Sequence, residues 1–226
     1  MHDPEQVKAY AESDFTASDH AMVQRLAAVW QPWRGARIAD LGCGPGNIAF
    51  RLLDQWPEVE VVAIDGSPAM LDVARDRCRH RTDTQRIRFF QDQLPFVSAS
   101  LPGLRTPLDG LVSNSVLHHL HDPDGLWISI KLLGRPGTVV QVCDLRRPAD
   151  EVQLQDLLRR HGSHLSPLVR DDYERSLRAA FTVDEVTQQL YRHGLLGLVV
   201  HRLGDQYLEV RGRLGPESDS SAGMLA

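Results

Sequence analysis

One stretch of eight residues constrains the fold more strongly than any other part of the chain. Residues 40–47 read Asp-Leu-Gly-Cys-Gly-Pro-Gly-Asn, between a short apolar run at 37–41 and a helical pattern that begins at Asn47. Glycines in such a turn let the backbone reverse sharply and approach a ligand closely. A strand, a glycine-rich turn and a helix in this order are typical of an α/β domain that binds a nucleotide-like ligand at the carboxyl edge of its sheet.

The remainder of the chain repeats the alternation of strand and helix. Apolar strands are predicted at 37–41, 59–64, 86–91, 108–113 and 138–143, with helical patterns between most of them. Because connections between parallel strands are right-handed crossovers, this rhythm predicts a parallel sheet. Two further strands, at 198–203 and 206–210, are joined by Gly204-Asp205 and are predicted to form a hairpin.

Helical segments flank this core on both sides in the sequence. Residues 4–31 read as two helices, the second capped by Ser18 or Asp19, and residues 149–180 read as two polar helices. Thr182 to Glu185 has the spacing of a capping box and predicts one more helix. We predict a single domain at 1–215, with an N-terminal helical cap at 1–32, a helical insertion at 149–180 after the fifth strand, and a disordered tail at 216–226.

Composition excludes several classes of function. The formal net charge of −5 argues against a general nucleic-acid binder, which needs a surplus of Lys and Arg. The three cysteines have no short spacing, so they predict neither a disulfide framework nor a zinc site and favour a reducing compartment. No apolar run approaches the roughly 18–20 residues of a membrane span, and the polar start is unlike a secretory signal. We expect a cytoplasmic protein without nucleic-acid or membrane partners, and the pattern predicts no oligomeric state.

Two carboxylates indicate which ligand the glycine turn serves. A dinucleotide site needs Gly-x-Gly-x-x-Gly, but Asn47 stands where the third glycine belongs and Gly46 comes one residue early. Asp40 beside a pyrophosphate would also cost roughly 1–4 kcal/mol. S-adenosylmethionine carries an ammonium and a sulfonium instead, which favour Asp40, and Asp65 at the end of the next strand can accept both ribose hydroxyls. The alternative that Asp40 only caps the turn stays open.

A series of motifs resembles the class I S-adenosylmethionine-dependent methyltransferases, in the form seen in small-molecule enzymes. The resemblance covers about residues 36–211, and it is carried by five stretches that are similar to the family's ordered motifs: 38–46, 61–71, 89–96, 112–120 and 132–138. Two features depart from the family pattern. The stretch after Phe96 is short and contains prolines, and Arg135-Pro136 replaces the usual Pro-Gly-Gly.

The resemblance implies a three-layer, Rossmann-like fold with a seven-stranded, mostly parallel sheet in the order 3-2-1-4-5-7-6, whose last strand is antiparallel. It implies S-adenosylmethionine as cofactor and S-adenosylhomocysteine as product. The glycines and Asp40 would then contact the methionine part, Asp65 the ribose, and Met70 with Asp92 the adenine. The implied cofactor-binding residues are Asp40, Gly42, Cys43, Gly44, Gly46, Asn47, Asp65, Gly66, Ser67, Met70, Asp92, Gln93, Asn114 and Ser115.

Residues for the transfer step are harder to predict, because methyl transfer is an in-line displacement that needs a base only when the acceptor loses a proton. His118, His119 and Asp144 follow the fourth and fifth strands at the expected ligand edge and are our candidate catalytic residues. No metal is expected, because these histidines lack the spacing of a ligand set. The candidate substrate contacts are Tyr10, Phe15, Arg146, His164 and Tyr173, for which ordinary packing is the alternative.

The leading hypothesis is therefore methyl transfer to a small molecule. A nucleic-acid or protein methyltransferase is disfavoured, because residues 113–116 read Ser-Asn-Ser-Val where many of those enzymes have Asn/Asp-Pro-Pro-aromatic. Two alternatives stay open: a nucleotide-dependent oxidoreductase and a non-catalytic module that binds S-adenosylmethionine.

Overall fold

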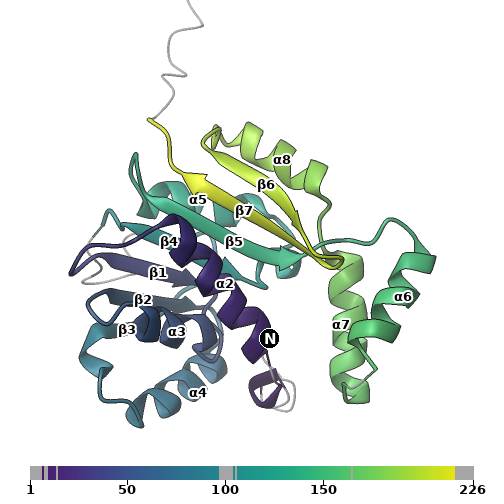
Figure 1. Ribbon diagram of the computed structural model, residues 1–226, viewed down its shortest axis with the longest axis horizontal. Coiled ribbons are helices and arrows are strands. Elements are labelled where there is room, and N and C mark those ends of the chain that lie inside the picture. Colours follow the sequence, from purple (N-terminus) through teal and green to yellow (C-terminus); the bar gives the residue numbers. More distant parts are fainter. Residues whose placement is uncertain are drawn as a thin grey trace, which may run out of the picture.

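The computed structural model describes residues 7, 10–13, 15–96, 104, 106–163 and 165–216. Its centre is one seven-stranded sheet in the order β3-β2-β1-β4-β5-β7-β6, as predicted (Figure 1). All neighbouring strands are parallel except β7, which is antiparallel to β5 and β6. The strands are β1 (Arg37–Leu41), β2 (Glu60–Asp65), β3 (Ile87–Gln91), β4 (Gly110–Asn114), β5 (Val139–Leu145), β6 (Leu198–Leu203) and β7 (Tyr207–Arg213).

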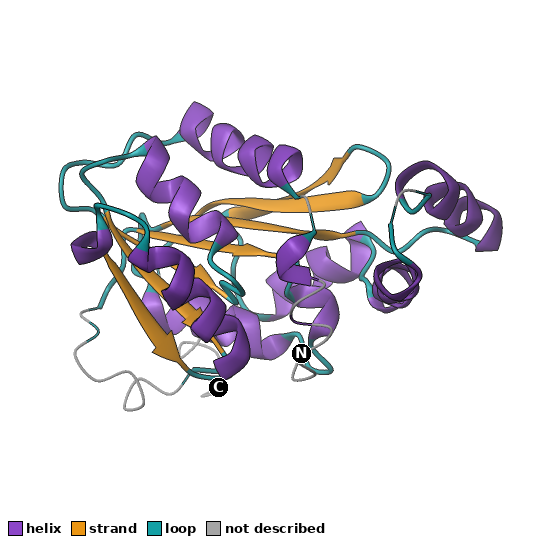
Figure 2. Ribbon diagram, turned by 90° about the horizontal axis from the view of Figure 1, so that it is seen from below, coloured by secondary structure: helices purple, strands orange, loops and turns teal. Residues whose placement is uncertain are grey.

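Helices cover both faces of the sheet and make a three-layer structure (Figure 2). One face packs against α2 (Thr16–Val29), α3 (Asn47–Gln55) and α4 (Pro68–Arg79), and the other against α5 (Asp124–Leu133) and α8 (Val183–Arg192). Successive side chains of β1 alternate between the two layers: Ile38 packs with the first set and Ala39 with the second. Burial on both faces explains why the parallel strands are nearly continuous apolar runs.

The last strand is longer than its sequence pattern predicts. It runs to Arg213 rather than Val210, because it lies between two partners and pairs along its whole length with β5, from Leu145 opposite Tyr207 to Val139 opposite Arg213. Backbone pairing therefore continues where the apolar pattern has already ended.

The insertion after β5 forms two helices, α6 (Glu151–His161) and α7 (Pro167–Ala179), which stand beyond the end of the sheet (Figure 1). Side chains start both helices: Asp150 accepts the Gln153 amide at 2.8 Å, and Ser166 caps α7 ahead of Pro167. Leu154, Leu157, Leu158 and Leu177 pack with Leu145 in a small core of their own.

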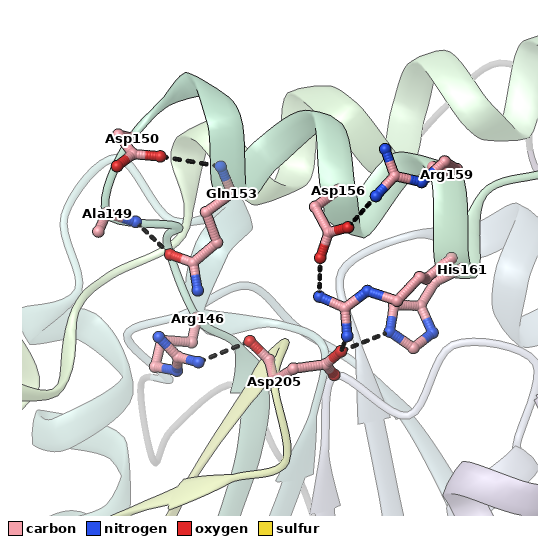
Figure 3. A network of polar contacts seen from close by, with 9 residues as sticks. Arg146, Ala149, Asp150, Gln153, Asp156, Arg159, His161 and Asp205 are labelled. Carbon is pink, nitrogen blue, oxygen red and sulfur yellow. Dashed lines mark hydrogen bonds and ion pairs between the residues drawn. The ribbon is translucent and has the colours of Figure 1, made fainter.

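A polar network joins α6 to the turn between β6 and β7 (Figure 3). The carboxylate of Asp205 bonds to Arg160 at 2.5 Å and to His161 at 3.0 Å, while its carbonyl oxygen accepts from Arg146 at 2.5 Å. These contacts fix the direction in which the α6–α7 pair leaves the sheet, and so position α7 beside the carboxyl ends of β4 and β5.

Some sequence predictions fall on residues that the structure does not describe. They concern most of the loop expected at 97–107, most of the first N-terminal helix and most of the tail. The boundaries of the single domain, its cap and its insertion stay predictions. None of the helices in the described ranges combines the length and apolar character that crossing a bilayer requires.

The hydrogen bonds at the start of α8 allow a test of how this helix is stabilised. The backbone amide of Glu185 donates to Thr182 Oγ1 at 3.2 Å, and the backbone amide of Thr182 donates to Glu185 Oε2 at 2.7 Å. Thr182→Ala removes the hydroxyl that accepts the Glu185 amide and is expected to lower the free energy of unfolding by about 1 kcal/mol in chemical denaturation. Thr187→Ala, at an exposed position of the same helix, is the control, with an expected change within about 0.5 kcal/mol. Equal effects of the two changes would contradict the capping role.

Candidate functional site

The glycine turn between β1 and α3 is built from left-handed backbone. Gly42 has φ +75° and Gly44 has φ +51°, and the amides of Gly42 and Cys43 both donate to the Ile64 carbonyl, which ties the turn to β2. A Cβ at Gly42 would lie 2.3 Å from a methyl carbon of Val116, whereas one at Gly44 would meet no atom within 4 Å. Gly42 therefore allows close packing against the β4 loop, and Gly44 faces open space.

That space is a cavity of about 360 Å³ at the carboxyl edge of the sheet, here called the first cavity. It is lined by residues that follow β1, β2, β3 and β4, which meet there because the strands are parallel. Every residue expected to bind the cofactor lines it except Gly46, whose φ is +87° and at which a Cβ would lie 2.7 Å from a ring carbon of Phe50.

Asp65 connects the two loops on either side of this cavity. Its Oδ2 accepts the Gly44 amide at 2.7 Å and its Oδ1 accepts the Ser67 amide at 2.7 Å. Ser67 in turn caps α4, whose first residue is Pro68. Each carboxylate oxygen has a second lone pair, so Asp65 can still accept hydrogen bonds from a ligand.

The first cavity is strongly acidic. Asp40 is 1% exposed, and its burial, with Asp65 and Asp19 nearby, raises its pKa to about 8. Asp40 Oδ2 is buried without a hydrogen-bond partner in the described chain. No Lys or Arg of the described ranges lines the cavity. Buried carboxyl groups without cations fit a positively charged ligand and oppose a diphosphate, so these residues fit S-adenosylmethionine.

Asp19 is a site residue that the sequence analysis missed. It was expected to cap the second helix, but α2 begins at Thr16, and Asp19 is a helical residue, 3% exposed, that lines the cavity. Asn114 Nδ2 donates to its Oδ1 at 3.4 Å. The missed signal was its spacing, because residue 19 continues the buried stripe of Met22, Val23 and Leu26. An acid on the apolar face of a helix needs a polar partner.

A second cavity, of about 370 Å³, adjoins the first. It lies between α7 and four residues near the start of the chain, here called the N-terminal segment: Tyr10, Phe15, Ser18 and Asp19. Five residues line both cavities: Tyr10, Asp19, Asn114, Ser115 and His119.

Of the expected substrate contacts, Tyr10, Phe15 and Tyr173 line the second cavity. Arg146 lines neither cavity, because its guanidinium turns to the Asp205 carbonyl in the β6–β7 turn (Figure 3). His164 lies outside the described residues.

The three candidate catalytic residues occupy different positions. Asp144, at the end of β5, is 1% exposed and lines neither cavity. Its Oδ2 accepts the amides of Val116 and Leu117 at 2.8 and 2.7 Å, and its Oδ1 lies 2.6 Å from His118 Nδ1. Both carboxylate oxygens of Asp144 are therefore engaged away from the two cavities.

His118 and His119 form the short 3-10 helix η3 (Leu117–His119) with their rings 4.0 Å apart. His118 is buried and lines the second cavity, while His119 is exposed and lines both. The surrounding protein and the neighbouring His118 lower the pKa of His119, so this imidazole is neutral near pH 7. Within the described ranges, no three His, Cys, Asp or Glu side chains are grouped to hold a metal ion.

The raised pKa of Asp40 predicts a pH-dependent stability. The folded protein keeps this proton to about pH 8, whereas the unfolded chain loses it near its ordinary value of about 4. The unfolded state thus binds fewer protons between these values, and the free energy of unfolding falls as the pH rises. Asp40→Asn removes this loss, so its stability advantage over the wild type should be larger at pH 8 than at pH 5 by more than about 1 kcal/mol. Denaturant titrations of the ligand-free protein measure this, and equal differences at both pH values would refute it.

Comparisons with known proteins agree with this geometry. Residues 39–140 match a family model described as a methyltransferase domain. The malonyl-[acyl-carrier protein] O-methyltransferase of Paenibacillus sp. (strain JDR-2) is 34% identical over 101 residues, which is 45% of this chain and 36% of that protein. The trans-aconitate 2-methyltransferase of Mycobacterium marinum is 28% identical over 151 residues, 59% of this chain and 49% of that protein. These matches thus span a third to a half of the length of the curated relatives.

The fold is shared over almost the whole chain. A crystal structure of an S-adenosylmethionine-dependent methyltransferase from Aquifex aeolicus superposes with a TM-score of 0.67 at 15% identity, covering 95% of this chain and 100% of that one. Residues 39–140 thus match the sequence of a methyltransferase domain, and the chain as a whole shares the fold of an S-adenosylmethionine-dependent methyltransferase.

Proposed function

We propose that this protein transfers a methyl group from S-adenosylmethionine to a small-molecule acceptor, with the cofactor in the first cavity and the acceptor in the second. The observation that carries the proposal is the wall that the two cavities share at Tyr10, Asp19, Asn114, Ser115 and His119. Two ligands of different chemistry can meet at this wall, while each keeps its own binding surface.

Different residues of the first cavity would bind different parts of the cofactor. Asp40 and the glycine turn would receive its amino-acid end, because a buried carboxyl with an unpartnered oxygen matches an ammonium. Asp65 would accept the ribose hydroxyls beside its bonds to the two loops. Met70, Asp92 and Gln93 line the remaining part of the cavity, where the adenine would lie.

The cofactor supplies a methyl group that is already activated by its bond to a sulfonium sulfur. The protein then has to align the acceptor with that methyl group and exclude water. The N-terminal segment and α7, which form opposite walls of the second cavity, serve this purpose. No metal ion enters the proposal.

The compartment and partners are part of the same proposal. All three cysteines, Cys43, Cys78 and Cys143, are free and buried, which supports a reducing compartment such as the cytoplasm. The net charge of −5 supports a small-molecule acceptor over a nucleic acid. A non-catalytic binding module is the alternative. Release of S-adenosylhomocysteine in the presence of an acceptor distinguishes the enzyme from such a module.

Asp65 gives the sharpest test of cofactor binding. Asp65→Ala is expected to weaken the binding of S-adenosylhomocysteine by about 1–3 kcal/mol, because the ribose hydroxyls lose their acceptor. Isothermal titration calorimetry measures this difference. Asp72→Ala is the matched control, since Asp72 is a 76% exposed carboxylate on α4 that lines neither cavity. An unchanged affinity of Asp65→Ala, or tight binding of NAD(H) in place of S-adenosylhomocysteine, would rule out the proposed site.

A further inference from the structure

We propose that the acceptor is an uncharged, largely apolar molecule with a phenol-type or enol-type hydroxyl, and that His118, oriented by Asp144, removes the proton of that hydroxyl. This inference rests on the proposed function, because it concerns the acceptor cavity of the same site. It differs from what the names of the relatives would suggest, since malonyl and aconitate groups carry carboxylates.

The walls of the second cavity are mostly apolar and aromatic. Phe15 and Tyr10 pack against each other on the N-terminal side, with ring centroids 4.9 Å apart and the rings tilted by 38°, and α7 forms the opposite side. A volume of about 370 Å³ is within the range of small-molecule sites. The remaining apolar or aromatic side chains that line this cavity are Leu145, Leu165, Val169, Tyr173, Ala179 and Tyr207. Such walls favour a flat, apolar ligand.

Charges in the second cavity oppose a carboxylate acceptor. Arg175 is the single Arg or Lys among the described lining residues, and it is 67% exposed and paired with Asp172 at 3.5 Å. Asp19 adds a buried carboxyl at the wall where the reaction would occur. A carboxylate that entered this cavity would lose its hydration and approach a like charge without gaining a cation.

Two tyrosines that line the second cavity have pKa values raised by burial and by neighbouring acidic groups. Burial, then Asp19 and other neighbouring acidic groups including Asp144, raise the pKa of Tyr207 to about 12. Burial followed by Asp19 likewise raises the pKa of Tyr10 above its ordinary value. A cavity that disfavours its own phenolates also disfavours a free phenolate ligand. The acceptor therefore enters as a neutral hydroxyl, and its proton needs a base at the cavity wall.

His118 is the base that this geometry provides. Asp144 holds Nδ1 at 2.6 Å, so the imidazole keeps the N–H on that side and Nε2 is the nitrogen that can act on a ligand in the second cavity. Asp144 is itself fixed by two backbone amides, so the ring has a single orientation. His119 is a poorer base because its pKa is lowered.

The proton and electron balance of the step is complete without a further reactant. The O–H bond of the acceptor breaks and its proton passes to Nε2 of His118, while an oxygen lone pair forms the new bond to the methyl carbon. The carbon–sulfur bond breaks with its electron pair remaining on sulfur, which becomes the neutral sulfur of S-adenosylhomocysteine. Asp144 stabilises the imidazolium until its proton leaves to solvent.

A paired panel of acceptors tests the substrate class. The enzyme is first shown to bind S-adenosylhomocysteine, and turnover is then followed for alkylphenols and for benzoates with the same alkyl groups, with trans-aconitate included. We expect kcat/KM for the phenols to exceed that for the matched benzoates by at least about tenfold. If the protein binds S-adenosylhomocysteine but prefers the carboxylates, or methylates no phenol of the series, the inference is overturned and the proposed function stands. If S-adenosylhomocysteine does not bind, the proposed function itself fails.

Variants of His118 test its role as base. His118→Ala is expected to lower kcat for an alkylphenol by about 100-fold or more, with KM and the affinity for S-adenosylhomocysteine within about threefold of wild type. The loss should be smaller for a fluorinated, more acidic phenol, because such an acceptor needs less help in losing its proton. His121→Ala, at an exposed position that lines neither cavity, is the control and should keep wild-type kcat. An equal loss of kcat for both phenols would mean that His118 only shapes the cavity, and would refute its role as base.

Discussion

The character of the candidate site depends most on three carboxyl groups that lie close together at the carboxyl edge of the sheet. Asp40, Asp65 and Asp19 come from β1, β2 and α2, and they surround one cavity that no Lys or Arg of the described chain lines. Burying acidic groups together costs free energy, and here the cost raises the pKa of Asp40 to about 8. Sites that disturb pKa values in this way are often functional, and a ligand with an ammonium and a sulfonium would relieve the repulsion.

The same edge of the sheet also sets up the chemistry. The loop after β4 carries His118 and His119, and the end of β5 supplies Asp144, which holds that loop through two backbone amides and His118 through its ring. Because β4 and β5 are parallel neighbours, their carboxyl ends lie side by side and the two groups meet without any long connection. The α6–α7 insertion then closes the outer side, and the network around Asp205 fixes its position. In the proposed function, acceptor specificity would thus reside in parts added to a sheet whose own residues would bind the cofactor.

Much of this could be predicted from the sequence, and the reasons are local. The strands around β1 are buried on both faces, so they read as apolar runs, and the glycine turn requires backbone conformations that few other residues adopt. Thirteen of the fourteen expected cofactor residues line the first cavity, because they follow strand ends that parallel pairing brings together. Asp19 and Arg146 were misread for the opposite reason. The orientation of each depends on elements far away in the sequence, namely the β4 loop for Asp19 and the β6–β7 turn for Arg146.

The sequence alone determined the fold, the position of the turn and the chemical character of the cofactor site, because helix and strand periodicity, positive φ and charge are properties of short stretches. Only the tertiary structure decided which side chains share a wall with that site. It placed Asp144 in the interior, away from both cavities, and His118 in the wall of the second cavity. It also showed that the walls of the second cavity are apolar and acidic rather than basic. Such distinctions arise from packing between N-terminal helix, sheet and insertion, and contacts of that range leave no periodic signal in the chain.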